Sequence, residues 1–142
     1  MVQLYLLPGE PDVIISVDTS AVMAVILNEA TKRRLLTLTR GAELQSAPSL
    51  PWEVGNGITA LFKRGRIGLR QAGQALDSLA RIPVRLADVD LGAAVEMAHE
   101  FGIYAYDAYV IECARRYHTP LLSLNEPQCD VARQLGVEVM EV

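Results

Sequence analysis

The chain has 142 residues, of which 51% are hydrophobic and 21% are charged. This composition argues against a disordered chain and predicts one domain with a sizeable buried core. The formal net charge of −4 excludes a global basic field that would attract nucleic acid or an anionic membrane. No apolar run is long enough to span a membrane, and residues 1–12 lack the basic start of a signal peptide. We therefore expect a cytoplasmic globular protein.

Strands and helices are predicted to alternate along the chain. An apolar run rich in β-branched residues predicts a strand at 13–17, and short apolar segments predict strands at 83–86, 121–124 and 137–139, with a weaker candidate at 44–47. Apolar residues at helical spacing, bounded by glycine or proline, predict helices at 20–27, 29–39, 52–64, 69–79, 91–101, 106–116 and 129–135. This alternation favours βαβ units and an α/β fold with a mostly parallel sheet. Residues 1–12 are interpreted as an N-terminal extension, either loose or docked on a partner as a strand or arm.

Two of the predicted strands end next to polar side chains. The first strand leads directly into Asp18 and, two residues later, Ser20. The strand at 121–124 contains Ser123 and is followed by Asn125. In a parallel sheet the carboxyl ends of all strands lie at one edge, where ligands bind. We therefore expect Asp18 and the segment around Asn125 to share a cleft.

Two further acids lie where predicted helices begin. Glu53 is in the first turn of the 52–64 helix and Asp107 is in the first turn of the 106–116 helix. Taken singly, each acid has an ordinary explanation, because Asp18 could cap a helix and the other two suit the positive end of a helix dipole, by about 0.3–1 kcal/mol. Their ordered placement along one chain favours a shared site. Three clustered carboxylates can hold one or two hard metal ions that orient water and polarise a phosphoryl oxygen.

Four motifs in this order resemble those of the PIN domain family, and most closely the toxin component of VapBC toxin–antitoxin modules. The resemblance covers about residues 13–142. It implies a PIN-like three-layer α/β/α sandwich with a central, mostly parallel sheet of 4–5 strands and about seven helices, in which 13–142 form a single domain. The motifs are Asp18-Thr19-Ser20, Glu53 with Asn56, Tyr106-Asp107-Ala108 and Leu122-Ser123-Leu124-Asn125.

The resemblance also implies a function. Its members are Mg²⁺- or Mn²⁺-dependent endoribonucleases, commonly homodimers, which a small cognate antitoxin holds inactive. Carried over to this chain, Asp18, Glu53 and Asp107 are the expected catalytic and metal-binding residues. Side chains that could position the acids or a water molecule around them are Ser20, Asn56, Ser123 and Asn125.

Asn125 departs from the family pattern, which usually has a fourth acid at this position. Asparagine keeps an oxygen ligand but loses the charge. A unit charge ~5 Å from a metal contributes about 3 kcal/mol at an effective dielectric near 20, which is an upper bound. We expect an active but weaker metal site, with Asn125 as an additional candidate ligand. The alternative is a catalytically weakened PIN-like module that binds RNA or protein.

Several other residues have more than one interpretation. Trp52 is expected to be a core or interface anchor rather than a platform on which bases stack. Lys63, Arg64 and Arg66 are interpreted as a solvated helix end, with a phosphate-contacting rim as the alternative. The apolar helix near 22–27 could belong to the core or a dimer face, Leu35 and Leu36 could line a groove for an antitoxin helix, and the sequence does not separate these.

Overall fold

A computed structural model describes residues 13–142 of the chain. Four parallel strands form a central sheet in the order β3-β2-β1-β4. Within it, β1 lies next to both β2 and β4, so that Ile15 pairs with Leu44 and Val17 pairs with Leu122. The strands are β1 (Ile14–Val17), β2 (Glu43–Ser46), β3 (Val84–Leu86) and β4 (Leu121–Leu122).

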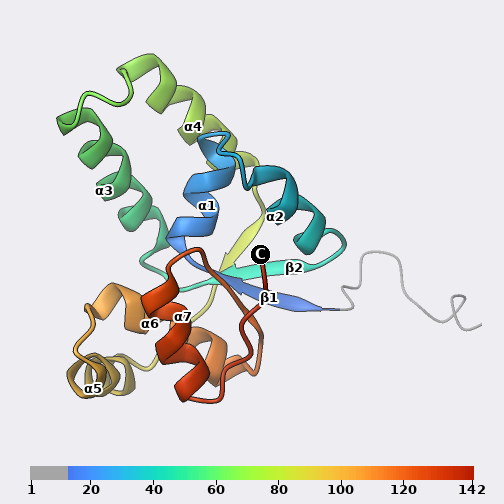
Figure 1. Ribbon diagram of the computed structural model, residues 1–142, viewed down its shortest axis with the longest axis vertical. Helices are drawn as coiled ribbons and strands as arrows, with labels where there is room; N and C mark the ends of the chain where they lie inside the picture. Colours follow the sequence, from blue (N-terminus) through green and yellow to red (C-terminus); the bar gives the residue numbers. More distant parts are fainter. Residues whose placement is uncertain (1–12) are drawn as a thin grey trace, which may run out of the picture.

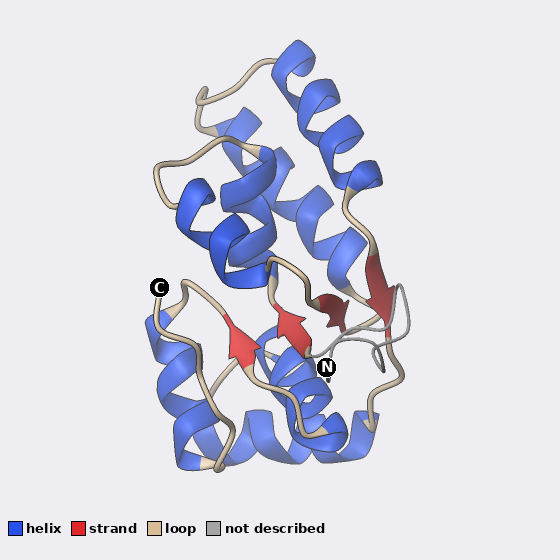
Figure 2. Cartoon of the chain, turned by 90° about the vertical axis from the view of Figure 1, so that its right-hand side faces the viewer, coloured by secondary structure: helices blue, strands red, loops and turns tan. Residues whose placement is uncertain are grey.

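The described residues form seven helices, arranged in two layers around the sheet (Figures 1 and 2). The first four helices cover one face of the sheet, and the last three cover the other. The expected three-layer α/β/α sandwich with a parallel sheet is therefore confirmed. The helices are α1 (Thr19–Ile26), α2 (Lys32–Thr39), α3 (Leu50–Lys63), α4 (Leu69–Arg81), α5 (Leu91–Phe101), α6 (Ala105–Tyr117) and α7 (Glu126–Gln134).

The two faces of the sheet are packed differently, because side chains alternate along each strand. Ile15 and Val17 of β1 belong to the apolar core beneath α1, α3 and α4. Ser16 points to the other face, where its Oγ lies 2.6 Å from Oγ1 of Thr119 and accepts a hydrogen bond from Nε2 of Gln45 at 3.0 Å. All three of these polar side chains are buried. The polar chain links β1 and β2 to the loop before β4, beneath α6.

The strands differ from the sequence prediction in length and position. The weak candidate at 44–47 is the internal strand β2, between β1 and β3. The strand predicted at 121–124 is limited to β4, because the chain turns at Ser123 toward the end of β1. The strand predicted at 137–139 is reduced to a single bridge between Val139 and Leu121.

Two helices begin three residues away from their predicted start, whereas α1, α3 and α6 begin one or two residues before theirs. The helix expected at 29–39 begins at Lys32. The last helix begins at Glu126, three residues before the predicted start at 129, because Asn125 caps it and Pro127 fits its first turn. The predicted start was too late because it took no account of this cap.

Gly57 allows α3 to pack closely against α1. A methyl group built on Gly57 would lie 2.9 Å from Cε of Met23 on α1, whereas one built on Gly55 would meet nothing within 4 Å. Only Gly57 of the two glycines therefore marks a close approach between the two helices.

Trp52 and Leu36 are exposed apolar residues. Trp52 is 72% exposed, which excludes the core role and leaves the interface interpretation. Leu35 is buried in the core, while Leu36 is 49% exposed beside it. The extension predicted for residues 1–12 lies outside the described residues. None of the helices of residues 13–142 is long and apolar enough to cross a membrane.

Candidate active site

Three acids lie at the edge of the sheet where its strands end. Asp18 directly follows β1 and is 5% exposed. Glu53 lies in the first turn of α3 and Asp107 in the first turn of α6, as the sequence predicts. Because α3 and α6 lie in opposite helical layers, the three acids approach this edge from both sides of the sheet.

Asp18 has two roles. As the N-cap of α1 it accepts a hydrogen bond on Oδ1 from the amide of Ala21 at 3.0 Å. Its carboxylate also accepts from Oγ of Ser20, at 2.7 Å and 2.9 Å from the two oxygens, and from Oγ of Ser123 at 2.6 Å. Both serine hydroxyls are themselves fixed from the chain after β4, because Ser20 accepts from the amide of Leu124 and Ser123 accepts from that of Asn125. The predicted meeting of Asp18 with the 123–125 segment is confirmed.

Glu53 is held by two hydroxyls. Ser49 donates to Oε2 at 2.6 Å and Thr19 donates to Oε1 at 3.0 Å. Thr19 directly follows Asp18, so this hydrogen bond joins the start of α3 to the start of α1. The carboxylate of Asp107, in contrast, forms no hydrogen bond with any of residues 13–142, although its backbone carbonyl accepts from Nε2 of Gln128 at 3.0 Å.

All three acids are harder to ionise than usual. Burial raises the pKa of Asp18, which the hydrogen bonds from Ser123, Ala21 and Ser20 lower and the charge of Asp107 raises again. Burial likewise raises the pKa of Glu53, with the Ser49 and Thr19 hydrogen bonds opposing it and the charges of Asp18 and Asp107 adding to it. The pKa of Asp107 is raised by burial. The charge of Asp107 therefore acts on both Asp18 and Glu53, and the charge of Asp18 acts on Glu53, in a partly desolvated space.

The donor set fits a divalent cation. None of Asp18, Glu53 and Asp107 forms a salt bridge within the described residues, so no side-chain cation offsets their charge. Carboxylate oxygens without histidine or cysteine suit a hard ion such as Mg²⁺, which keeps several waters and takes few direct protein ligands. In residues 13–142 no three His, Cys, Asp or Glu side chains converge closely enough to hold a metal ion together, so direct contact is limited to fewer of the acids. Glu53, whose two oxygens are already bound by hydroxyls, is suited to a contact through water.

The sequence of the chain matches a known family. The sequence model of the PIN domain matches residues 15–134, a span that contains all three acids. The chain belongs to the PIN domain family. No curated protein sequence matches it.

Two solved structures share the fold of this PIN domain. PAE2754 from Pyrobaculum aerophilum superposes with a TM-score of 0.65 at 22% identity, covering 84% of this chain and 79% of the other. VapC20 from Mycobacterium tuberculosis, described as a sarcin-ricin loop cleaving toxin, superposes with a TM-score of 0.59 at 17% identity, covering 82% and 93%. At these identities the similarity concerns the fold.

The structure treats the remaining predicted site residues differently. Ser20 and Ser123 bind the carboxylate of Asp18 directly, as described above. Asn125 lies next to this group, but its Oδ1 accepts from the amide of Gln128 at 3.2 Å and caps α7. Asn56 lies one turn after Glu53 on α3, is exposed, and forms no side-chain hydrogen bond with the three acids.

Three residues of the PIN site were not predicted from the sequence: Thr19, Ser49 and Gln128. Ser49 precedes Glu53 by four residues, and this spacing places two side chains on one face of a helix, so a signal was available. Thr19 lies 34 residues from Glu53 and carried no signal for that contact. Gln128 is 2% exposed and bridges the Ser123 hydroxyl and the Asp107 carbonyl, which ties α7 to α6 beneath the acids.

Proposed function

We propose that this PIN domain is a Mg²⁺- or Mn²⁺-dependent endoribonuclease that hydrolyses RNA phosphodiester bonds and serves as the toxin of a type II toxin–antitoxin system. The observation that carries the proposal is the group of three carboxylates at one sheet edge, which lack a side-chain cation and have raised pKa values. Membership of the PIN family and the fold shared with a toxin described as cleaving the sarcin-ricin loop support RNA as the substrate.

Asp18 and Asp107 would hold the metal directly, with Glu53 contributing directly or through water. When bound, such an ion supplies a polarised phosphoryl oxygen, an oriented water and stabilisation of the leaving oxygen. Carboxylates that repel one another gain most from a bound cation, because it offsets the cost of ionising them in a desolvated site. The raised pKa values of the acids support this assignment.

The hydroxyl groups of the site orient the acids and oppose the effect of burial on their ionisation. Ser20 and Ser123 donate to Asp18, and Ser49 and Thr19 donate to Glu53, and each of these hydrogen bonds favours the charged form that binds metal. Asp107, whose carboxylate has no such partner among the described residues, is free to bind the metal or to hold the proton of an attacking water.

A second candidate is a catalytically weakened PIN module that binds RNA or protein. Asn125 supports it, because this residue carries no charge and its Oδ1 is occupied by the cap of α7. The two candidates differ in whether the three remaining acids suffice for cleavage.

The proposed partners are RNA, a second copy of the chain and a small cognate antitoxin, in the cytoplasm. Trp52 and Leu91, which are 72% and 61% exposed, line one cavity of about 290 Å³ together with Tyr109. Exposed apolar side chains gathered in this way are typical of interaction surfaces. They support a homodimer, which sedimentation of the purified chain tests.

Cleavage of total RNA by the purified chain tests the enzyme. With Mg²⁺ or Mn²⁺ present the wild type is expected to cleave, and with EDTA it is expected to be inactive. Asp18→Asn and Asp107→Asn, purified in parallel, are expected to lose at least 100-fold in rate and so exclude a contaminating nuclease. Metal-independent cleavage that survives both substitutions, or no cleavage by the wild type, contradicts the proposal and favours the binding module.

A further inference from the structure

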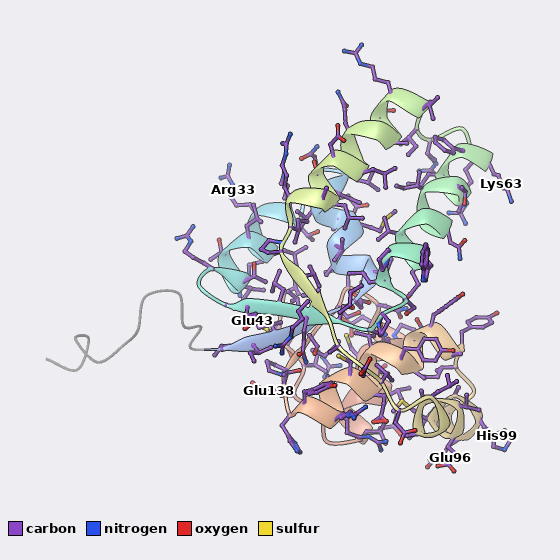
Figure 3. The ribbon with its side chains drawn as sticks, turned by 180° about the vertical axis from the view of Figure 1, so that it is seen from behind. Arg33, Glu43, Lys63, Glu96, His99 and Glu138 are labelled. Carbon is purple, nitrogen blue, oxygen red and sulfur yellow. The ribbon has the colours of Figure 1, made fainter. Side chains whose placement is uncertain are left out.

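Positive and negative charge are divided between the two halves of the chain. Residues 13–81, which run from β1 to the end of α4, contain nine lysines and arginines and five acids, of which two are Asp18 and Glu53. Residues 82–142 contain four basic residues and ten acids. The layer formed by α1–α4 is therefore basic although the whole chain has a net charge of −4. Figure 3 shows this division, with Arg33 and Lys63 on the α1–α4 side and Glu96 and Glu138 on the other.

The basic residues of the α1–α4 layer are not neutralised by neighbours. Within the described chain, none of the nine lysines and arginines of 13–81 forms a salt bridge. In the other half, Arg115 pairs with Glu112 at 3.0 Å and Arg133 pairs with Asp130 at 3.2 Å. In the described chain only Arg116 of α6 is a further basic residue without an ion pair, so most of the uncompensated positive charge lies on the α1–α4 layer.

Four of the nine form what we call the basic turn, which is Lys63, Arg64, Arg66 and Arg70. It joins α3 to α4 at the end of the hairpin that these two helices make away from the sheet (Figure 1). All four side chains are exposed, and no acid occurs between Glu53 and Asp77. Gly65, with φ at +65°, makes the turn after α3.

A polar hollow adjoins the basic turn. Arg66 lines a cavity of about 330 Å³ together with Gln71, Gln74 and Ser78 of α4, and with Asn28 and one acid, Glu29, after α1. The rest of the lining is apolar. The amide and hydroxyl groups of the cavity can donate hydrogen bonds beside the guanidinium group. This combination suits an anion that also accepts hydrogen bonds, and guanidinium groups bind phosphate in a bidentate manner.

We propose that the basic turn binds backbone phosphates of the RNA that the carboxylate site cleaves. The inference rests on the proposed function, and α3 supplies the geometric link because it carries Glu53 at one end and Lys63 at the other. Ten residues of helix separate them by about 15 Å, since each residue adds ~1.5 Å. A stacked strand advances ~3.4 Å per nucleotide, so the basic turn lies roughly four nucleotides from the cleaved bond. An RNA that extends this far reaches it and a shorter RNA does not.

The experiment compares two RNA lengths and two triple variants. One RNA ends within three nucleotides of the cleaved bond on both sides, and the other extends ten nucleotides further on each side. Arg64→Gln/Arg66→Gln/Arg70→Gln removes three charges from the basic turn. Arg33→Gln/Arg34→Gln/Arg40→Gln removes three equally exposed and unpaired charges from the α2 region and is the matched control.

For the basic-turn variant, the KM of the long RNA is expected to rise about tenfold or more with kcat unchanged, while the short RNA keeps its wild-type KM. The slope of log KM against log salt for the long RNA should fall by about 2, since each lost phosphate contact on a single strand removes ~0.7. The α2 control is expected to change either KM less than twofold.

Three results overturn the inference. Equal effects of both triple variants mean a general field rather than a site. Equal effects on short and long RNA mean that the turn acts through the fold. An unchanged KM for long RNA combined with lost affinity for an acidic protein partner makes the turn a protein-docking site.

If the wild type cleaves no RNA, the proposed function fails separately. Fluorescence anisotropy of the same two RNAs in EDTA then still tests whether the basic turn binds RNA. Binding that depends on RNA length and that the basic-turn variant weakens tenfold supports the inference, and binding that does not depend on length refutes it.

Discussion

The hydroxyl of Ser123, just after β4, donates to Oδ2 of Asp18, at the end of the adjacent strand β1, over 2.6 Å. This hydrogen bond joins the ends of two neighbouring parallel strands through the acid itself. It also opposes the rise that burial causes in the pKa of Asp18. The position and the ionisation of this carboxylate therefore depend on one side chain from the far end of the sequence.

Ser123→Ala is expected to raise the pKa of Asp18 further and to weaken Mn²⁺ binding about three- to tenfold, with a larger loss at pH 6 than at pH 8. Titration calorimetry at the two pH values measures this. Ser46→Ala is the matched control, because the Ser46 hydroxyl is equally buried but donates to the backbone carbonyl of Val17. Both variants should lose about 1–2 kcal/mol of stability. Only the first should lose metal affinity, and equal losses in both would refute the assignment.

Asp18→Asn is expected to be at least as stable as the wild type at pH 7 without metal. In the folded chain the pKa values of Asp18 and Glu53 lie above the ordinary 3.8 and 4.5. At pH values just above these ordinary values, the folded chain therefore binds more protons than the unfolded chain. Its free energy of unfolding therefore falls as pH rises through this window, and the cost persists at neutral pH. Asparagine carries no charge and still caps α1.

The same pair of proteins should respond differently to metal. Mn²⁺ or Mg²⁺ is expected to raise the Tm of the wild type, because a ligand that binds only the folded state stabilises it, and to leave Asp18→Asn unchanged. Thermal unfolding from pH 4 to 8 with and without metal measures both effects. If, without metal at pH 7, the Tm of the variant lies well below that of the wild type, the charge of Asp18 does not destabilise the folded state.

Asn125→Asp is expected to tighten metal binding and raise kcat/KM, each by about tenfold. Aspartate caps a helix as well as asparagine, so α7 should be preserved, while the new charge restores the acid that the family usually has. Asn125→Ser, which keeps a capping oxygen without charge, is the control. No gain from the aspartate would mean that this position lies too far from the metal to matter.

Ser49→Ala is expected to raise the pKa of Glu53 and to shift the acid limb of the kcat/KM profile to higher pH. The hydrogen bond from Ser49 lowers the pKa of Glu53 more than the hydrogen bond from Thr19 does. Thr19→Val should therefore give a smaller shift in the same direction. At pH values well above the limb both variants should stay within about threefold of the wild type. A pH-independent loss would mean that the hydroxyls position Glu53 rather than tune its ionisation.

Gly55→Ala is expected to stabilise the chain by up to about 1 kcal/mol, because alanine favours a helix and nothing obstructs its methyl group. Gly57→Ala should gain less or lose stability, since Met23 must move away from the new methyl group. For a chain of this size 1 kcal/mol shifts Tm by roughly 2–4 °C. Equal shifts for the two variants would indicate that Met23 moves away from the new methyl group without a cost in stability.

Much of the layer arrangement could be predicted from the sequence, because β1 and most helices have strong apolar patterns. The weak candidate β2 shows where the pattern fails. Its residues Gln45 and Ser46 are polar yet buried, and their partners come from Val17, Ser16 and Thr119 elsewhere in the fold. Burial that depends on distant hydrogen bonds leaves no local pattern in the sequence.

The candidate site was predictable in its acids and less so in the groups that hold them. Asp18, Glu53 and Asp107 stand at element ends, which the sequence marks. The contact of Thr19 with Glu53 depends on how α1 and α3 cross, and that of Gln128 with Asp107 depends on how α6 and α7 meet. The capping role of Asn125 was not predictable for the same reason, because it requires a helix that begins at Glu126.

The two edges of the described sheet are both short. On one side lies β3, with three residues and an ion pair from Arg85 to Glu43 of β2, and on the other lies β4, with two residues covered by the bridge to Val139. Short, charged or covered edges give a second chain little backbone to pair with. Strand exchange and growth of the sheet through residues 13–142 are therefore disfavoured, and self-association of this part of the chain is expected to use helices and their side chains.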